Sequence, residues 1–202
     1  MGIENKQISG RVDDFKICVL LTASINPLKG CQYLKRSDPK VREKDYINAL
    51  KAWIRKTPYP IVFCENSGYD LTNIKKIVEK VGRKDKEIEI LQFEGNDYPS
   101  ERGKGYGELL IIKYALEHSN LIKRTDYIIK VTGRYFIKNI QKITTSLREI
   151  DNLYVMARMK EDGAESLVFI SKPDFISDYL LKFQDQIQDH AKGYFGPNLE
   201  LC

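Results

Sequence analysis

No apolar run in the 202-residue sequence approaches the ~20 residues of a membrane-spanning helix. The opening residues, MGIENKQISGRVDD, are polar and lack the apolar core of a signal peptide. From these two absences we expect a cytoplasmic protein.

Cysteine and histidine are also scarce, which argues against a metal centre. The four cysteines show no C-x-x-C spacing, and Cys18 and Cys64 lie inside apolar runs. This placement is typical of buried, reduced thiols rather than of disulfides or zinc ligands. The only two histidines, His118 and His190, are isolated in the sequence, and we predict no catalytic or metal role for them.

Charge of one sign is not concentrated anywhere in the chain. Lys+Arg 33 against Asp+Glu 28 gives a net charge of +5, and the excess is spread along the sequence. A nucleic-acid-binding face would cluster its basic residues, so we expect no nucleic-acid partner. The balance suits an anionic small molecule or a membrane surface. The hydrophobic fraction of 42% is sufficient for one core.

The remaining pattern is an alternation of short apolar runs with amphipathic segments. Apolar or alternating runs predict strands at 15–21, 61–64, 87–93, 127–131, 153–159 and 166–171. Helical spacing predicts helices at 39–56, 71–81, 108–118, 140–150 and 173–188. The alternation indicates an α/β fold, a single doubly wound, mostly parallel mixed sheet with helices on both faces. We expect a polar arm at 1–14 and one domain over 15–202.

The most informative stretch is the one from residue 102 to 135. It predicts a Gly-rich basic loop, RGKGYG, that leads into the helix 108–118, followed by a strand that ends in Thr132-Gly133-Arg134-Tyr135. Glycines allow close approach of a backbone to a phosphate, and Lys or Arg supplies the countercharge. Without any ligand-binding role, the glycine segment would be a flexible loop and Thr132-Gly133-Arg134-Tyr135 an ordinary junction between a strand and a turn. We interpret the stretch as a phosphate-handling centre for a sugar nucleotide.

Two further strands end in polar residues. The first ends in Thr22-Ala-Ser-Ile-Asn26 and the second in Glu65-Asn66-Ser67-Gly68, which could alternatively be a simple turn before a helix. Ligands of open α/β sheets bind beyond the carboxyl ends of the strands, so these side chains are predicted to share one pocket with the end of strand 127–131.

These three strand ends, together with the Gly-Lys-Gly segment before a helix, resemble GT-A fold (Rossmann-like) glycosyltransferases of bacterial surface-polysaccharide and lipopolysaccharide synthesis. The resemblance covers about residues 15–172 and rests on the order of elements. It implies a nucleotide-sugar donor and a glycan or lipid-linked acceptor, with peripheral association at the inner membrane surface. The nucleotide-binding residues it implies are Thr22, Ala23, Asn26, Glu65, Asn66, Ser67, Arg102, Lys104, Gly105, Tyr106, Lys130 and Thr132.

The sequence departs from the family at one point. Where the family carries an Asp-x-Asp motif that holds a divalent cation, this chain reads Thr132-Gly133-Arg134. Arg134, with Lys130, could stabilise the leaving diphosphate without metal. We therefore expect that no cofactor is required, although binding of Mn²⁺ or Mg²⁺ is compatible with the predicted function. Inversion needs a carboxylate base, and its candidates are Glu108, Asp162, Glu165 and Glu200.

Two alternatives to glycosyl transfer remain. The missing Asp-x-Asp motif favours a non-catalytic binding module of the same fold. A sugar nucleotidyltransferase would carry a Gly-rich basic loop directly after the first strand, whereas residues 22–30 contain one glycine.

Overall fold

The computed structural model describes residues 16–28, 36–147, 150, 152–160 and 163–186. The predicted arm at 1–14 lies outside these residues, as do Cys31, Cys202, Asp162 and Glu200.

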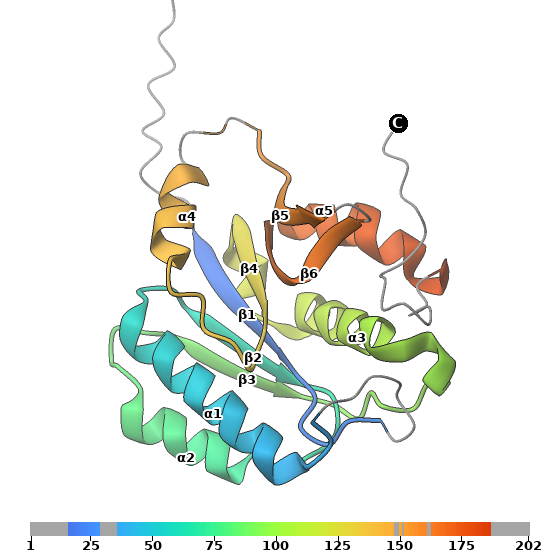
Figure 1. Cartoon of the computed structure of the whole chain (residues 1–202). Coiled ribbons are helices and arrows are strands. Elements are labelled where there is room, and N and C mark those ends of the chain that lie inside the picture. The colour runs from blue at the N-terminus through green and yellow to red at the C-terminus, as the bar shows by residue number, and fades with distance from the viewer. Residues whose placement is uncertain (1–15, 29–35, 148–149, 151, 161–162, 187–202) are drawn as a thin grey trace, which may run out of the picture.

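One six-stranded mixed sheet forms the centre of the molecule (Figure 1), which confirms the predicted α/β class. Its strands lie in the order β3-β2-β1-β4-β6-β5. The first four are parallel neighbours, and β6 runs antiparallel to both β4 and β5. The strand bounds are β1 (Ile17–Ala23), β2 (Ile61–Glu65), β3 (Ile88–Gln92), β4 (Tyr127–Thr132), β5 (Val155–Lys160) and β6 (Gly163–Ser171).

The helices cover both faces of the sheet. Figure 1 shows α1 (Pro39–Lys56) and α2 (Thr72–Val81) side by side on one face, while α3 (Gly103–His118) lies on the other. The short α4 (Ile140–Ser146) packs on the α1 face, and α5 (Pro173–Phe175) opens the C-terminal helical segment. The predicted start of α1 is confirmed, because Asp38 Oδ1 accepts a hydrogen bond from Lys40 N at 2.8 Å and Pro39 occupies the first turn.

Strand side chains alternate between two cores. Odd-numbered residues of β1 and β4, such as Leu21 and Val131, pack with Trp53 of α1. Even-numbered residues, such as Leu20 and Ile128, pack against α3. Both β1 and β4 are therefore buried on both faces, which explains why their sequences are mostly apolar, with Thr22, Lys130 and Thr132 as the polar exceptions.

Two predicted elements differ in detail. The segment 100–107 is not a Gly-rich loop: a 3₁₀ turn, η2 (Ser100–Arg102), passes directly into α3, which begins at Gly103. The last helix is irregular, because α5 continues as a π-helical turn, η5 (Ile176–Leu180), and then as a 3₁₀ segment, η6 (Leu181–Gln186).

Candidate functional site

The strand ends predicted to share a pocket do lie together. In the sheet register Ala23 is opposite Glu65, and Thr22 is opposite Thr132. The strand pairing continues one step beyond β2, since Asn66 N donates to Ala23 O at 3.1 Å. We refer to this end of β2, β1, β4 and the adjoining β6 as the carboxyl edge.

The chain that follows β1 is held by side chains of α1 and β2. Ser24 N donates to the Tyr46 hydroxyl at 3.1 Å, Ile25 N to Glu65 Oε1 at 2.9 Å, and Asn26 N to Ser67 Oγ at 2.9 Å. Three consecutive backbone N–H groups are thus already satisfied by protein acceptors.

Arg42 and Tyr46 were not predicted as site residues, although both hold this segment. Arg42 donates to Ser24 O from Nε at 2.8 Å and from Nη2 at 2.5 Å. The sequence does carry a signal for Arg42, because this arginine lies one helical turn before Tyr46 on the otherwise apolar face of α1. Burial raises the pKa of Tyr46, while the charges of Arg42 and Arg134 oppose the rise and that of Glu108 adds to it. Arg134 and Glu108 therefore both lie within electrostatic reach of the Tyr46 hydroxyl.

Glu65 is fully buried and joins the ends of β1 and β2. Its Oε1 accepts from Ile25 N and from the Ser67 hydroxyl, and its Oε2 accepts from Ser67 N at 3.0 Å. Both carboxylate oxygens are engaged by the protein, so Glu65 shapes the edge rather than offering a free group to a ligand.

Asn66, the next residue, differs from Glu65. Its side chain is 1% exposed, and Oδ1 has no hydrogen-bond partner among the described residues. Its backbone is fixed on both sides, because Asn66 N donates to Ala23 O and Gly95 N donates to Asn66 O at 2.7 Å. A buried amide oxygen without a partner is costly, which marks this position as one where a ligand donor would be favourable.

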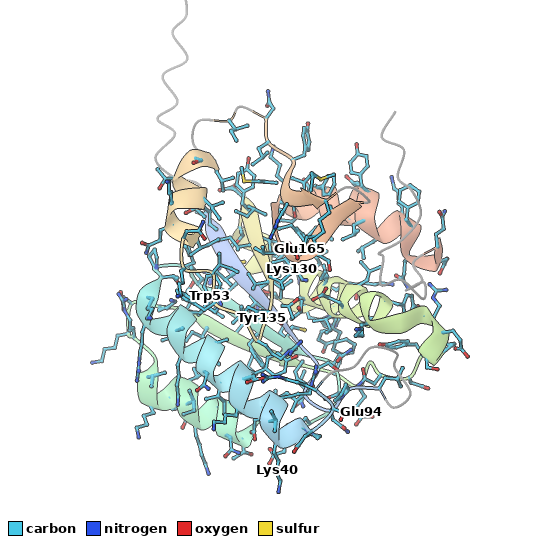
Figure 2. All side chains as sticks on the ribbon, in the orientation of Figure 1. Lys40, Trp53, Glu94, Lys130, Tyr135 and Glu165 are labelled. Atoms are coloured by element: carbon cyan, nitrogen blue, oxygen red, sulfur yellow. The ribbon has the colours of Figure 1, made fainter. Side chains whose placement is uncertain are left out.

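A buried ion pair connects α3 to β4 (Figure 2 labels its lysine). Lys130 is fully buried, and its Nζ lies 2.6 Å from Glu108 Oε1 and donates to Ser166 O at 2.5 Å. The same Glu108 oxygen accepts from the hydroxyls of Thr22 at 2.8 Å and Thr132 at 3.0 Å. Complete burial lowers the pKa of Lys130, and the neighbouring Glu108 carboxylate raises it in part.

Four residues that were predicted to bind ligand or to act in catalysis belong to this network: Thr22, Glu108, Lys130 and Thr132. Lys130 is engaged by Glu108 and Ser166, and it lies inside the molecule. We therefore assign Lys130, Thr22 and Thr132 to the support of the edge, where they fix the carboxylate of Glu108.

Arg134 lies on a turn that is fixed from three directions. Gly133 N donates to Thr22 O at 2.8 Å, Tyr135 N donates to Thr132 O at 3.0 Å, and Trp53 Nε1 donates to Tyr135 O at 2.8 Å. Figure 2 shows Trp53 and Tyr135 close together on the α1 face. A side chain at Gly133 would place its Cβ 2.8 Å from Thr22 O, so only glycine fits where the turn crosses β1.

The guanidinium of Arg134 is not used by this scaffold. Its Nε is buried without a hydrogen-bond partner among the described residues, and the same part of the chain offers it no carboxylate. Among the described residues its guanidinium contacts the Tyr135 ring, whose centroid lies 5.5 Å from Arg134 Cζ. A cation held on a rigid turn with unused donors is suited to an anionic ligand.

The glycines of the 103–107 segment serve packing. A Cβ at Gly107 would clash with the Tyr98 hydroxyl oxygen, and Gly103, with φ of 75°, turns the chain into α3. Arg102 stacks on the Tyr106 ring at 4.1 Å and donates to Gln184 O at 2.7 Å. Arg102 and Tyr106 thus attach the C-terminal segment to the start of α3, while Gly105 is buried and Lys104 is exposed.

Of the candidate bases, Glu108 and Glu165 lie among the described residues. Because Val131 is opposite Val168 in the antiparallel pair, the first residues of β6 extend past the end of β4. Glu165 therefore lies at the carboxyl edge, and Figure 2 shows it near Lys130. Its Oε1 is 3.1 Å from Lys160 Nζ, and its side chain is 23% exposed.

A hollow lies at the opposite end of the strands. A cavity of about 650 Å³ is lined there by Lys16, Ile17, Pro58, Tyr59, Pro60, Glu87, Leu121, Arg124, Thr125, Gln141, Thr144 and Thr145. Two of its charged groups pair with each other, since Arg124 Nη2 is 2.7 Å from Glu87 Oε2. The polar groups of the carboxyl edge point to a site better than this hollow does.

Over the described part of the chain, no three His, Cys, Asp or Glu side chains come together as a metal site, and no helix is long and apolar enough to cross a membrane. Peripheral association with a membrane surface stays a prediction. Cys18 and Cys64 are free thiols, as predicted, and burial raises the pKa of Cys18 to about 12.

No protein-family model and no curated protein matches the sequence. Among solved structures, the chain is similar to a cytidylyltransferase from Leptospira borgpetersenii (13% identity, TM-score 0.49), covering 82% of this chain and 63% of that one. It is also similar to CMP:2-keto-3-deoxy-manno-octonic acid synthetase in complex with CTP (10%, TM-score 0.44, covering 82% and 78%). A third similar structure is HddC from Yersinia pseudotuberculosis (15%, TM-score 0.39, covering 82% and 80%). At these values the neighbours assign no activity to this chain.

Proposed function

We propose that the protein is a glycosyltransferase that moves a sugar from a nucleoside-diphosphate sugar to a glycan or lipid-linked acceptor in surface-polysaccharide synthesis. The observation that carries the proposal is a pair of buried polar atoms without partners at the carboxyl edge, Asn66 Oδ1 and Arg134 Nε. One is an acceptor and the other a donor. A ligand with a base N–H at one end and phosphate oxygens at the other would satisfy both.

The order of groups along the carboxyl edge supports the same ligand. Asn66 follows β2, Thr22 and Glu108 lie at the end of β1, and Arg134 follows β4. Glu165 comes next, on β6. Three interstrand steps of about 4.8 Å span about 14 Å. An extended sugar nucleotide presents base, ribose, diphosphate and sugar in a matching sequence.

In this arrangement Arg134 binds the diphosphate and stabilises the charge that develops on the leaving group. A guanidinium offers a permanently charged, bidentate fork to phosphate oxygens. The turn that carries it is held by Gly133 N and Trp53 Nε1. Little reorganisation is therefore needed during the reaction. This chemistry does not strictly require a metal, although Mn²⁺ or Mg²⁺ could assist it.

Glu165 is the base that we favour among the described carboxylates. It adjoins the edge beyond Arg134, where the sugar and its acceptor would lie, and it remains partly exposed. Glu165 pairs with two exposed side chains, those of Lys160 and Arg158. Glu108, in contrast, is held by the fully buried Lys130 and by the hydroxyls of Thr22 and Thr132. Glu200 and Asp162 lie outside the described residues and stay predictions.

The occupied N–H groups after β1 favour glycosyl over nucleotidyl transfer. A nucleotidyltransferase would be expected to bind a triphosphate with free backbone N–H groups of this loop. At Ser24, Ile25 and Asn26 these groups instead donate to protein side chains.

The experiment is a turnover assay with a panel of UDP-, GDP-, CMP- and dTDP-linked sugars and simple glycoside acceptors, with and without EDTA. We expect acceptor-dependent release of nucleotide from one diphosphate-linked donor, retained in EDTA. Release of pyrophosphate from a nucleoside triphosphate and a sugar phosphate would identify a nucleotidyltransferase. Nucleotide binding with no turnover under any condition would support the non-catalytic module.

A further inference from the structure

We infer that Glu108 binds a ribose hydroxyl of the donor nucleotide through its second carboxylate oxygen, Oε2, and thereby selects ribonucleotides over deoxyribonucleotides. The inference rests on the proposed function and names the part of the donor that this carboxylate recognises.

The two oxygens of Glu108 have different surroundings. Oε1 receives Lys130 Nζ and the hydroxyls of Thr22 and Thr132, all within 3.0 Å. Oε2 has no partner within the described part of the chain, and the side chain is 16% exposed. A carboxylate oxygen is only an acceptor, with two lone pairs. Glu108 therefore presents one rigidly held, unused acceptor.

The position of this acceptor is between the two groups assigned to the ends of the nucleotide. Glu108 is bonded to Thr22 of β1 and Thr132 of β4, so it lies over the junction of these strands. Asn66 is one strand to one side, and Arg134 follows β4 on the other. In a nucleoside diphosphate the ribose lies between base and phosphate.

The chemistry of Glu108 favours a hydroxyl over other parts of the ligand. A carboxylate repels phosphate oxygens and accepts from O–H donors. A cation would need further ligands, and the described residues place no group of three His, Cys, Asp or Glu side chains together. Carboxylates also hold ribose hydroxyls in other nucleotide-binding α/β sheets.

The test is a comparison of ribonucleotides with their 2′-deoxy and 3′-deoxy counterparts in the Glu108→Gln variant. The best nucleoside diphosphate is first chosen by calorimetry with UDP, GDP, CDP and ADP on the wild-type protein. We expect the wild type to prefer the ribonucleotide by about tenfold or more over one deoxy form, as befits a hydrogen bond to a charged group. In Glu108→Gln the preference should fall to about threefold or less.

The ratio of ribonucleotide to deoxyribonucleotide affinity is measured within each variant, so a general loss of stability does not mimic a loss of ribose preference. If Glu108→Gln does not fold, Glu108→Gln combined with Lys130→Met removes both buried charges together. Asn73→Ala, on the outer surface of α2, is the control and should keep the wild-type ratio.

Three outcomes distinguish failure of this inference from failure of the proposed function. An equal loss of affinity for ribo and deoxy forms in Glu108→Gln would reduce Glu108 to a structural role and overturn the inference, leaving the proposed function intact. Absence of a ribose preference in the wild type would do the same. If none of the nucleoside diphosphates binds the wild type, the proposed function itself fails, and this inference with it.

Discussion

The amino and carboxyl ends of the parallel strands both carry buried or partly buried polar side chains, but these side chains are paired to different extents at the two ends. At the amino end, a cavity of about 650 Å³ is lined by polar groups that pair with one another, such as Arg124 with Glu87. The carboxyl edge, in contrast, holds Asn66 Oδ1 and Arg134 Nε without partners among the described residues. The amino end has one such atom, the neutral hydroxyl of Ser171, opposite Ile128 near the start of β4.

Unpaired buried polar groups, rather than empty volume, single out the carboxyl edge of this protein. A protein that folds without a ligand normally satisfies its buried donors and acceptors. Leaving an amide oxygen and a guanidinium nitrogen unused, on backbones that are fixed on all sides, is costly unless a ligand supplies the partners. The comparison can be tested by matched substitutions at the two ends.

The largest expected effect concerns the buried ion pair of the carboxyl edge. Lys130→Met should lower the free energy of unfolding by about 3–5 kcal/mol, because it leaves the Glu108 carboxylate without its cation. Its counterpart at the amino end, Arg124→Ala, breaks a pair whose side chains are 56% and 58% exposed and should cost below about 1 kcal/mol. Urea unfolding of both variants measures this. Equal losses would show that the two ends are not held differently.

Next in size is the effect of Arg134 on turnover. Arg134→Ala should reduce the rate of transfer by about 10²–10³-fold, as removal of a charge-stabilising donor does elsewhere. Arg134→Lys should retain part of the rate, since it keeps the charge but loses the bidentate fork. Arg124→Ala is the control and should be fully active.

Thermal unfolding of the Arg134 variants should match that of the wild type, because the guanidinium makes no ion pair with the described residues. Full activity of Arg134→Ala, or loss of wild-type activity in EDTA that Mn²⁺ restores, would refute metal-free stabilisation by this arginine.

A smaller effect is expected at the unpaired amide. Asn66→Ala should weaken nucleotide binding by about 1–2 kcal/mol, the loss of one buried hydrogen bond. Its unfolding free energy should change little, since Oδ1 has no partner in the described part of the protein. Ser171→Ala removes the unpaired hydroxyl of the amino end and should leave nucleotide affinity unchanged. Calorimetric titration of both variants decides the point, and an unaltered affinity in Asn66→Ala would remove it from the site.

The last expected effect is a pH dependence of stability that arises at the amino end. Lys86 Nζ donates to the carbonyls of Trp53 at 2.7 Å and Thr57 at 2.7 Å, at the end of α1. Burial, aided by the charge of Arg83, lowers the pKa of Lys86 from 10.5 to about 8. Between these values the unfolded chain binds more protons than the folded one, so stability should rise with pH.

Above about pH 10.5 Lys86 is neutral in both the folded and the unfolded chain, so its burial costs no stability. As the pH falls through about 8 the folded protein must bury the charged amine, and that part of the stability is lost. Urea midpoints measured from pH 7.5 to 10.5 should show the rise in the wild type and a flatter profile in Lys86→Met. A wild-type profile that falls over this range would contradict the assignment.

Much of the fold could be predicted from the sequence, because its information is local. Apolar runs such as 17–21 and 61–64 specify strands buried on both faces, and Asp38-Pro39 specifies the start of α1. The alternation of elements determined the mixed sheet, and with it the edge at which Thr22, Asn66 and Arg134 meet.

The sequence could not decide the roles of side chains at that edge. RGKGYG is equally compatible with a phosphate loop and with the tight start of a helix. Only the structure shows that α3 begins at Gly103 and that the Tyr98 side chain packs against Gly107. Lys130 and Glu108 lie far apart along the chain and look like two free charges. Their pairing exists only because α3 crosses the ends of β1 and β4. Which polar groups are consumed by the fold and which remain for a ligand depends on long-range contacts, and the tertiary structure alone decides that.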